Sequence, residues 1–270
     1  MNLNTIVDVK RPKSFEEIEW RDGHAFLGGG TWLFSEPQVA TDTLVDLERL
    51  GWPALTATPQ GLEIAATCKI VELHDYKGPP DWKAVPLFDK CIDAFLMSFK
   101  IWNAATVGGN LVMSLPAGAM ISLTAALEGV CTLWPQKDKP RQVPVVDFVT
   151  GMHTNVLQKG ELLRSILLPA SALRKRSAMR QVSLTRYGRS AALIVATVND
   201  AGDDFLLTVS AATPRPVHIR FKKTPTAAEM RDAIDARLPP DAWFHDVHGS
   251  APYKRHVTFY LAEQIRAELS

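Results

Sequence analysis

The segment "HAFLGGGTW", residues 24–32, places three consecutive glycines directly behind a short apolar run. The apolar run predicts a buried strand that leads into a loop. An ordinary turn needs only one or two glycines, and a glycine backbone can be approached closely because it carries no Cβ. The run therefore indicates a strand–loop unit in which another group comes close to the backbone of residues 28–30.

A second loop, "TVGGN" at residues 106–110, combines two glycines with small hydrogen-bonding side chains. Backbone N–H groups in such loops can converge on an anion, and Thr31, Thr106 and Asn110 can add side-chain donors. Each loop alone is more simply a tight turn. Together they favour a shared dinucleotide site, although neither matches GxGxxG or GxxxxGK[ST].

Apolar spacing predicts the remaining elements and a division near residue 170, where the charged segment 170–178 ends the first apolar pattern. We expect a first domain of residues 1–170, in two α/β subdomains of about 1–53 and 54–170, and an α+β second domain of residues 171–270. In the first domain we expect a helix start at 11–21, a strand at 42–50, a strand from 61 followed by a helix from about 69, and a strand at 161–169. In the second domain we expect strands at 180–186, 192–198 and 204–212 and helices at 225–237 and 253–268.

Two predictions concern the segment between residues 88 and 130. Ile92, Phe95, Leu96 and Phe99 stand at helical spacing, which predicts one helix over 88–101 with a buried face. A short strand is expected to carry the second glycine pair, followed by a loop and an apolar helix up to residue 130.

The bulk composition excludes several classes of function. The 270 residues carry a net charge of +1 without a basic stripe, so we expect no nucleic-acid partner. No apolar run approaches the length of a membrane span, and the N-terminus lacks a signal peptide, so a cytoplasmic location is expected, with export beside a signal-bearing partner left open. The three cysteines stand far apart, and the C-terminal histidines lie beside a turn without an acidic triad, so no metal site is expected.

The motifs "LGGGTWL", "NAATVGGN", "SLPAG", "KGELLRSILLP" and "DVHGSAPYKRHV" occur in this order along nearly the whole chain. In this respect the sequence resembles the FAD-binding medium subunit of the molybdenum hydroxylases, a family that includes carbon monoxide dehydrogenase, xanthine dehydrogenase and aldehyde oxidoreductases. The resemblance implies an α+β fold: a two-subdomain FAD-binding fold of the vanillyl-alcohol-oxidase (PCMH) type, followed by a smaller α+β C-terminal domain that covers the flavin.

The resemblance also implies a cofactor site, by position. The first loop would wrap the pyrophosphate of FAD, the second would lie against it, and Leu163 would approach the adenine or flavin. Arg180 would lie near the isoalloxazine, where a cation is useful because negative charge builds up there on reduction. The implied set is Leu27, Gly28, Gly29, Gly30, Thr31, Trp32, Thr106, Gly109, Asn110, Leu163 and Arg180.

Three positions depart from the family pattern. Trp102 precedes Asn103 where the family often has an arginine, and Met113 stands where a small polar residue is common. Ala119 occupies the position of an aspartate that hydrogen-bonds FAD. Loss of that carboxylate removes about 1–3 kcal/mol of polar contact, while backbone contacts to the pyrophosphate would survive.

The function implied is electron transfer within a heteromeric complex. FAD would take electrons from a small two-cluster iron–sulfur subunit and pass them to an external acceptor, while a large molybdopterin-binding subunit oxidises the substrate. No catalytic acid or base is expected in this chain. Two alternatives stay open: a subunit that retains the fold without FAD, and a flavin-dependent oxidase with its own substrate.

Overall fold

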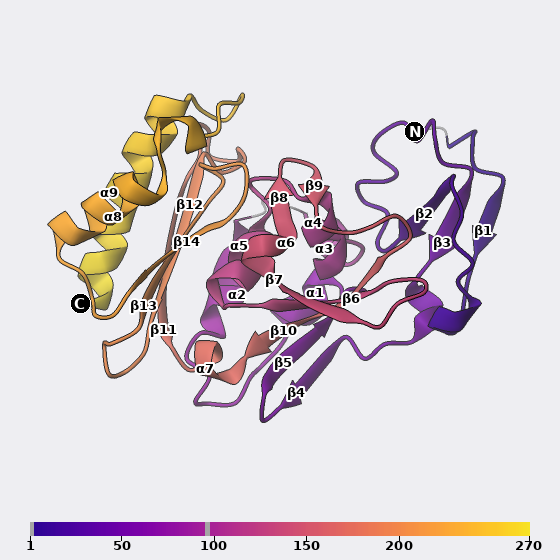
Figure 1. The fold of residues 1–270 in the computed structure, drawn as a ribbon, viewed down its shortest axis with the longest axis horizontal. Coiled ribbons are helices and arrows are strands. Elements are labelled where there is room, and N and C mark those ends of the chain that lie inside the picture. Colours follow the sequence, from indigo (N-terminus) through magenta and orange to yellow (C-terminus); the bar gives the residue numbers. More distant parts are fainter. Residues whose placement is uncertain (1–2, 95–97) are drawn as a thin grey trace.

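The computed structural model describes residues 3–94 and 98–270. Three sheet-containing units follow one another along the long axis of the molecule (Figure 1). The N-terminal unit and the C-terminal helices lie at opposite ends, with a helix-rich central unit between them. This mixed architecture confirms the predicted α+β class.

The N-terminal unit is a three-stranded parallel sheet in the order β1-β3-β2. Its strands are β1 (Asp8–Lys10), β2 (His24–Leu27) and β3 (Thr43–Asp46). The short 3-10 helix η1 (Phe15–Glu17) lies between β1 and β2, and a second one, η2 (Glu48–Leu50), follows β3. The helix start predicted at 11–21 is therefore only the single turn η1. The three glycines begin at the residue after β2, as the sequence predicted.

The central unit is a five-stranded antiparallel sheet in the order β4-β5-β10-β6-β7. Its strands are β4 (Leu55–Thr58), β5 (Gly61–Ala65), β6 (Val130–Trp134), β7 (Arg141–Pro144) and β10 (Leu162–Pro169). The middle strand β10 pairs on both sides, and none of its residues is exposed, which explains its almost continuous apolar sequence. Around the sheet lie α1 (Ile70–His74), α2 (Pro86–Asp93), α3 (Phe99–Trp102), α4 (Val107–Met113), α5 (Ala119–Ala126), α6 (Val145–Phe148), α7 (Ala170–Leu173) and the hairpin β8 (Val149–Gly151)–β9 (Thr154–Asn155).

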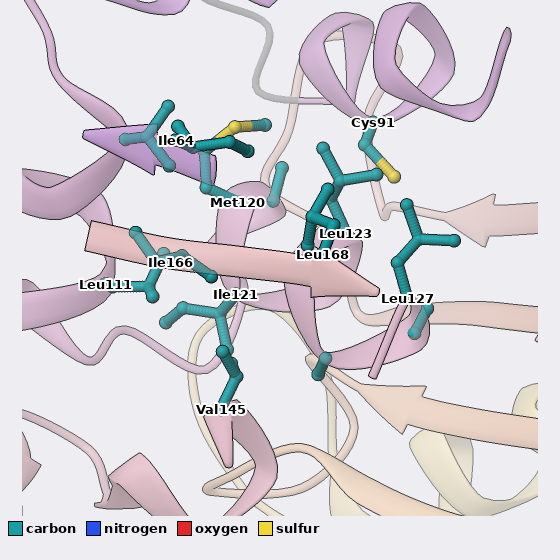
Figure 2. Packing of buried hydrophobic residues seen from close by; sticks show 14 of the residues in the cluster. Ile64, Cys91, Leu111, Met120, Ile121, Leu123, Leu127, Val145, Ile166 and Leu168 are labelled. Atoms are coloured by element: carbon teal, nitrogen blue, oxygen red, sulfur yellow. The ribbon is translucent and has the colours of Figure 1, made fainter. Parts of the chain in front are cut away.

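Helix α5 lies at the centre of the molecule, and all eight of its residues are buried. Figure 2 shows Met120, Ile121 and Leu123 packed among side chains of β5, β10 and α4. From the opposite side α5 meets the C-terminal sheet, where the hydroxyls of Ser122 and Ser210 lie 2.7 Å apart. A helix covered on all sides needs no polar face, which explains the apolar sequence.

Two sequence predictions for this unit are wrong. Residues 88–101 do not form one helix, because α2 ends at Asp93 and α3 begins at Phe99, which is 68% exposed rather than buried. Phe95 and Leu96 lie outside the described residues. The second glycine pair lies in the first turn of α4 rather than in a strand, and a Cβ at Gly108 would lie 2.5 Å from the Cβ of Ala66. Glycine is therefore required there so that α4 can pack closely against the chain after β5.

The C-terminal unit is a four-stranded antiparallel sheet in the order β11-β12-β13-β14. Its elements are β11 (Arg176–Val182), β12 (Ala192–Val198), β13 (Phe205–Ser210), β14 (Val217–Phe221), α8 (Ala227–Arg237), η3 (Pro240–Ala242) and α9 (Ala251–Leu269). Helices α8 and α9 cover the outer face and α5 the inner face (Figure 1), so β12 is buried along its whole length. The sequence predicted these elements except β14 and η3, and it placed the start of β11 four residues too late.

Candidate cofactor site

A cavity of about 1000 Å³ opens where the three units meet. It is lined by the first glycine loop, the second glycine loop with the segment up to residue 118, the start of β10, and two loops of the C-terminal unit. This volume lies at the upper end of the range for small-molecule and cofactor sites, and the lining is mostly apolar, as in such sites generally.

The backbone of the first glycine loop offers free hydrogen-bond donors to this cavity. Over the described residues, no acceptor is found for the N–H groups of Gly28, Gly29, Gly30 and Thr31. Gly30 has a φ of +72°, a conformation that favours glycine, and its carbonyl accepts from Phe34 in the turn that follows. Successive free N–H groups in such a turn form a concavity suited to an anion.

The glycines also allow the two loops to touch each other. A Cβ added at Gly29 would lie 1.7 Å from the carbonyl oxygen of Ala104, and one at Gly28 would lie 2.9 Å from Oγ1 of Thr106. Any side chain at Gly29 would therefore push the first loop away from the second. Close loop–loop packing is a requirement that the sequence alone did not reveal.

In the second loop, two predicted ligand side chains also hold the local structure. Thr106 caps α4, because its Oγ1 accepts from the N–H of Gly109 at 3.1 Å. Asn110 accepts from the N–H of Met120 through its Oδ1 at 3.2 Å and so fixes the start of α5. Gly108, Gly109 and Asn110 of α4 line the cavity, but the N–H groups of the first turn of α4 are already bonded within the protein, to the carbonyls of Ala66, Cys68 and Thr106 and to Oγ1 of Thr106.

At the start of β10, the cavity wall contains a buried ion pair. Glu161, 4% exposed, accepts from Nε and Nη2 of Arg141 at 2.7 and 2.6 Å and from the N–H of Gln158 at 2.9 Å. Burial raises the pKa of Glu161, but the bonds from Arg141 and Gln158 outweigh it and hold the pKa below its usual value. The two charges compensate each other within the pair, and Leu163 lines the cavity two residues further along.

The C-terminal unit supplies lining residues that the sequence analysis did not identify. Arg189 and Ser190 come from the β11–β12 connection, and Phe244, Asp246 and His248 from the loop before α9. Lys254, in the second turn of α9, anchors the loop that precedes this helix. Its side chain is fully buried, and its ammonium lies 2.9 Å from Oδ1 of Asp246, 3.2 Å from the carbonyl of Ala211 and 5.0 Å from the ring centroid of Phe244.

Every predicted site residue except Arg180 lines the cavity. Arg180 instead pairs with Glu268 of α9. The residues that depart from the family pattern also lie away from the lining, apart from Met113. The ring of Trp102 packs 5.0 Å from that of His74, and Ala119 is fully buried at the start of α5. Among residues 3–94 and 98–270, no cluster of metal-binding side chains and no helix able to span a membrane is found.

Comparisons with known proteins agree with this geometry. The family model described as "FAD binding domain in molybdopterin dehydrogenase" matches residues 4–171. Comparison with curated protein sequences gives no match. The fold is similar to that of quinoline 2-oxidoreductase from Pseudomonas putida 86, with a TM-score of 0.82 and 17% identity over 100% of this chain and 98% of that one.

Two further structures show the same fold. Carbon monoxide dehydrogenase from Hydrogenophaga pseudoflava gives a TM-score of 0.84 and 18% identity over 98% of this chain and 97% of that one. Carbon monoxide dehydrogenase from Oligotropha carboxidovorans gives 0.75 and 19% over 96% and 97%. The family match covers more than half of the sequence, so the chain belongs to the FAD-binding domain family of the molybdopterin dehydrogenases.

The residues present fit an FAD cofactor. The free N–H groups of the first loop suit a pyrophosphate, and the apolar lining suits the flavin and adenine rings. Ala119, which occupies the position of the aspartate expected from the family, is fully buried in the core, so its replacement of that aspartate opens no gap in the cavity wall. The site therefore depends on backbone donors more than on side-chain charges.

Proposed function

We propose that this chain is the FAD-binding electron-transfer subunit of a heteromeric molybdenum hydroxylase. The observation that carries the proposal is the set of four free backbone N–H groups, Gly28 to Thr31, in a cavity large enough for a dinucleotide. When bound, FAD would let electrons pass between one-electron carriers and two-electron acceptors.

The role of the chain's own residues is to bind and enclose the cofactor. Gly28 to Thr31 would hold the pyrophosphate through backbone donors. Leu163 and the neighbouring apolar lining would exclude water from the rings. The bonded carboxylates of Glu161 and Asp246 keep their negative charge compensated within the protein, which limits repulsion of an anionic ligand.

The proposed partners are a small two-cluster iron–sulfur subunit and a large molybdopterin-binding subunit. Support comes from the similarity of the fold to chains of carbon monoxide dehydrogenase and quinoline 2-oxidoreductase structures. The cysteines Cys68, Cys91 and Cys131 are buried and unpaired with one another, and burial raises the pKa of Cys68 and Cys131 to about 12. Such thiols are poor metal ligands, so the clusters are assigned to a partner.

The test is the absorption spectrum of the purified chain before and after addition of FAD, with the released cofactor identified. Flavin absorption at about one equivalent per chain is expected. A colourless protein that takes up no added FAD would refute the proposal and favour a subunit that retains the fold without cofactor. Reduction of the bound flavin by a substrate of its own, in the isolated chain, would instead favour an oxidase.

A further inference from the structure

One charged side chain lies inside the packing of the C-terminal unit. Lys254 is 0% exposed and stands on the buried face of α9, where Val257, Leu261 and Ile265 pack against the sheet. An ammonium group loses its hydration when it is buried, and a buried ion pair adds little net stability over apolar side chains of similar size. Packing alone therefore does not explain a lysine at this position.

The contacts of the Lys254 ammonium group join two separate segments. It lies 2.9 Å from Oδ1 of Asp246 and 5.0 Å from the ring centroid of Phe244, both in the loop before α9. The same Oδ1 accepts from the N–H of His248 at 2.8 Å. The ammonium group also donates to the carbonyl of Ala211 at 3.2 Å, and Ala211 belongs to the corner that follows β13.

The corner at Ala211 is strained and is bonded to the central unit. Ala211 has a φ of +62°, and the N–H of Ala212 donates to the carbonyl of Ser210 at 2.7 Å, which makes the corner a γ-turn of the rare, strained form. The N–H of Ala211 donates to the carbonyl of Pro116 at 2.9 Å, and the carbonyl of Ala212 accepts from the N–H of Phe244 at 2.9 Å. Strained backbone of this kind is typical of binding sites, where the surrounding structure holds it in place.

These bonds connect two walls of the cavity from behind. Pro116 belongs to the lining segment 115–118 of the central unit, and Phe244 and Asp246 belong to the lining loop of the C-terminal unit. Lys254 and Ala211 are not among the described residues that line the cavity. Lys254 therefore acts on the site through the loop before α9 and through the corner that bonds to the other wall.

We propose that Lys254 is a positioning residue of the cofactor site: it holds the loop 244–248 against the segment 115–118, so that the cavity has its binding width before the cofactor enters. This inference rests on the proposed function. A site whose walls are fixed in advance loses less free energy to ordering when the ligand binds. A site that is only partly in the competent arrangement binds more weakly, in proportion to the competent fraction.

The experiment compares the full-length wild-type chain with Lys254→Met, Asp246→Asn and the double variant. Ile265→Ala is the matched control for stability, because Ile265 is fully buried on the same face of α9 and is not among the described lining residues. The readouts are the dissociation constant of FAD, the urea midpoint of unfolding, and amide hydrogen exchange of Ala211 and Phe244 in the apoprotein. Those two amides donate the bonds that connect the segments.

Lys254→Met is expected to raise the dissociation constant of FAD about tenfold, which corresponds to a fall of the competent arrangement to about one tenth of the population. Exchange of the Ala211 and Phe244 amides should accelerate by at least about tenfold relative to amides of β12. The double variant buries no uncompensated charge, so it should be more stable than Lys254→Met and yet bind FAD about tenfold more weakly than Asp246→Asn. Ile265→Ala should lose stability and keep the wild-type dissociation constant.

Equal affinity of the double variant and Asp246→Asn would overturn the inference, since Lys254 would then serve only to compensate the charge of Asp246. Equal weakening in Ile265→Ala and Lys254→Met would overturn it as well, because loss of stability alone would explain the effect. Unchanged exchange at Ala211 and Phe244 would have the same consequence. If Lys254→Met does not fold, the double variant measured against Asp246→Asn carries the comparison. A wild-type chain that takes up no FAD would instead refute the proposed function, and the exchange rates alone would then decide whether Lys254 joins the two walls.

Discussion

Replacing Gly29 by alanine is expected to weaken FAD binding at least ~100-fold and to destabilise the chain. The new Cβ would lie 1.7 Å from the carbonyl oxygen of Ala104, half of the 3.4 Å at which ordinary contact begins. A backbone carbonyl cannot rotate away as a side chain can, so the two loops must separate by more than 1 Å. Forced overpacking of this kind costs about 1–3 kcal/mol of stability.

The same displacement moves the donors that would hold the pyrophosphate. Hydrogen bonds to charged groups contribute about 1.5–3 kcal/mol each, so loss of two of them costs about 3 kcal/mol or more. That loss corresponds to at least a ~100-fold increase in the dissociation constant of FAD. The assay is titration of the apoprotein with FAD, followed by flavin fluorescence, alongside urea unfolding of the same preparation.

Gly202→Ala is the matched control. Gly202 has a φ of +72° with no atom near the position of an added Cβ, so alanine there costs about 1–2 kcal/mol of backbone strain without a clash. Its stability loss should be similar to that of Gly29→Ala, with wild-type FAD affinity. A Gly29→Ala chain that binds FAD and unfolds like wild type would refute the argument from loop packing.

Three further predictions concern other parts of the structure. Lys254→Met should cost about 3 kcal/mol in urea unfolding, because Asp246 loses its buried partner, and adding Asp246→Asn should recover part of the loss. Burial raises the pKa of Asp204, but Lys175 and Arg220 outweigh it and hold the pKa below its usual value, so this carboxylate stabilises the fold above about pH 4 and loses that contribution as the pH falls further. Asp204→Asn should therefore flatten the fall in unfolding free energy as the pH drops below about 4. The native chain should react with thiol reagents at pH 8 only after unfolding, since burial raises the pKa of all three cysteines, Cys68, Cys91 and Cys131.

The sequence predicted the parts of the site that depend on backbone chemistry. Glycine is needed wherever another group approaches the main chain, so both loops could be found from their composition alone. The strand before the first loop and the middle strand β10 followed from apolar runs with clear ends. The α+β class followed from the order of these elements.

Side chains contributed from distant segments were not predictable in this way. Arg189, Asp246 and Lys254 come together only through tertiary packing, and no local spacing connects them with the glycine loops. Arg180 was placed by position along the chain, but Arg180 faces α9 and not the cavity. The prediction of one helix over 88–101 was wrong for a related reason. The helical spacing of the apolar residues did not indicate that the helix ends at Asp93 or that Phe99 is exposed.

The three consecutive glycines answer three different local constraints rather than one. Gly28 leaves room for the hydroxyl of Thr106, Gly29 for the carbonyl of Ala104, and Gly30 adopts a positive φ while the ring of Phe34 lies over it. None of these contacts involves a ligand, yet together they leave the N–H groups of residues 28–31 without partners among the described residues. The requirement for packing and the capacity to bind an anion therefore arise from the same residues, so a substitution in the run cannot be read as a loss of ligand contact unless stability is measured beside it.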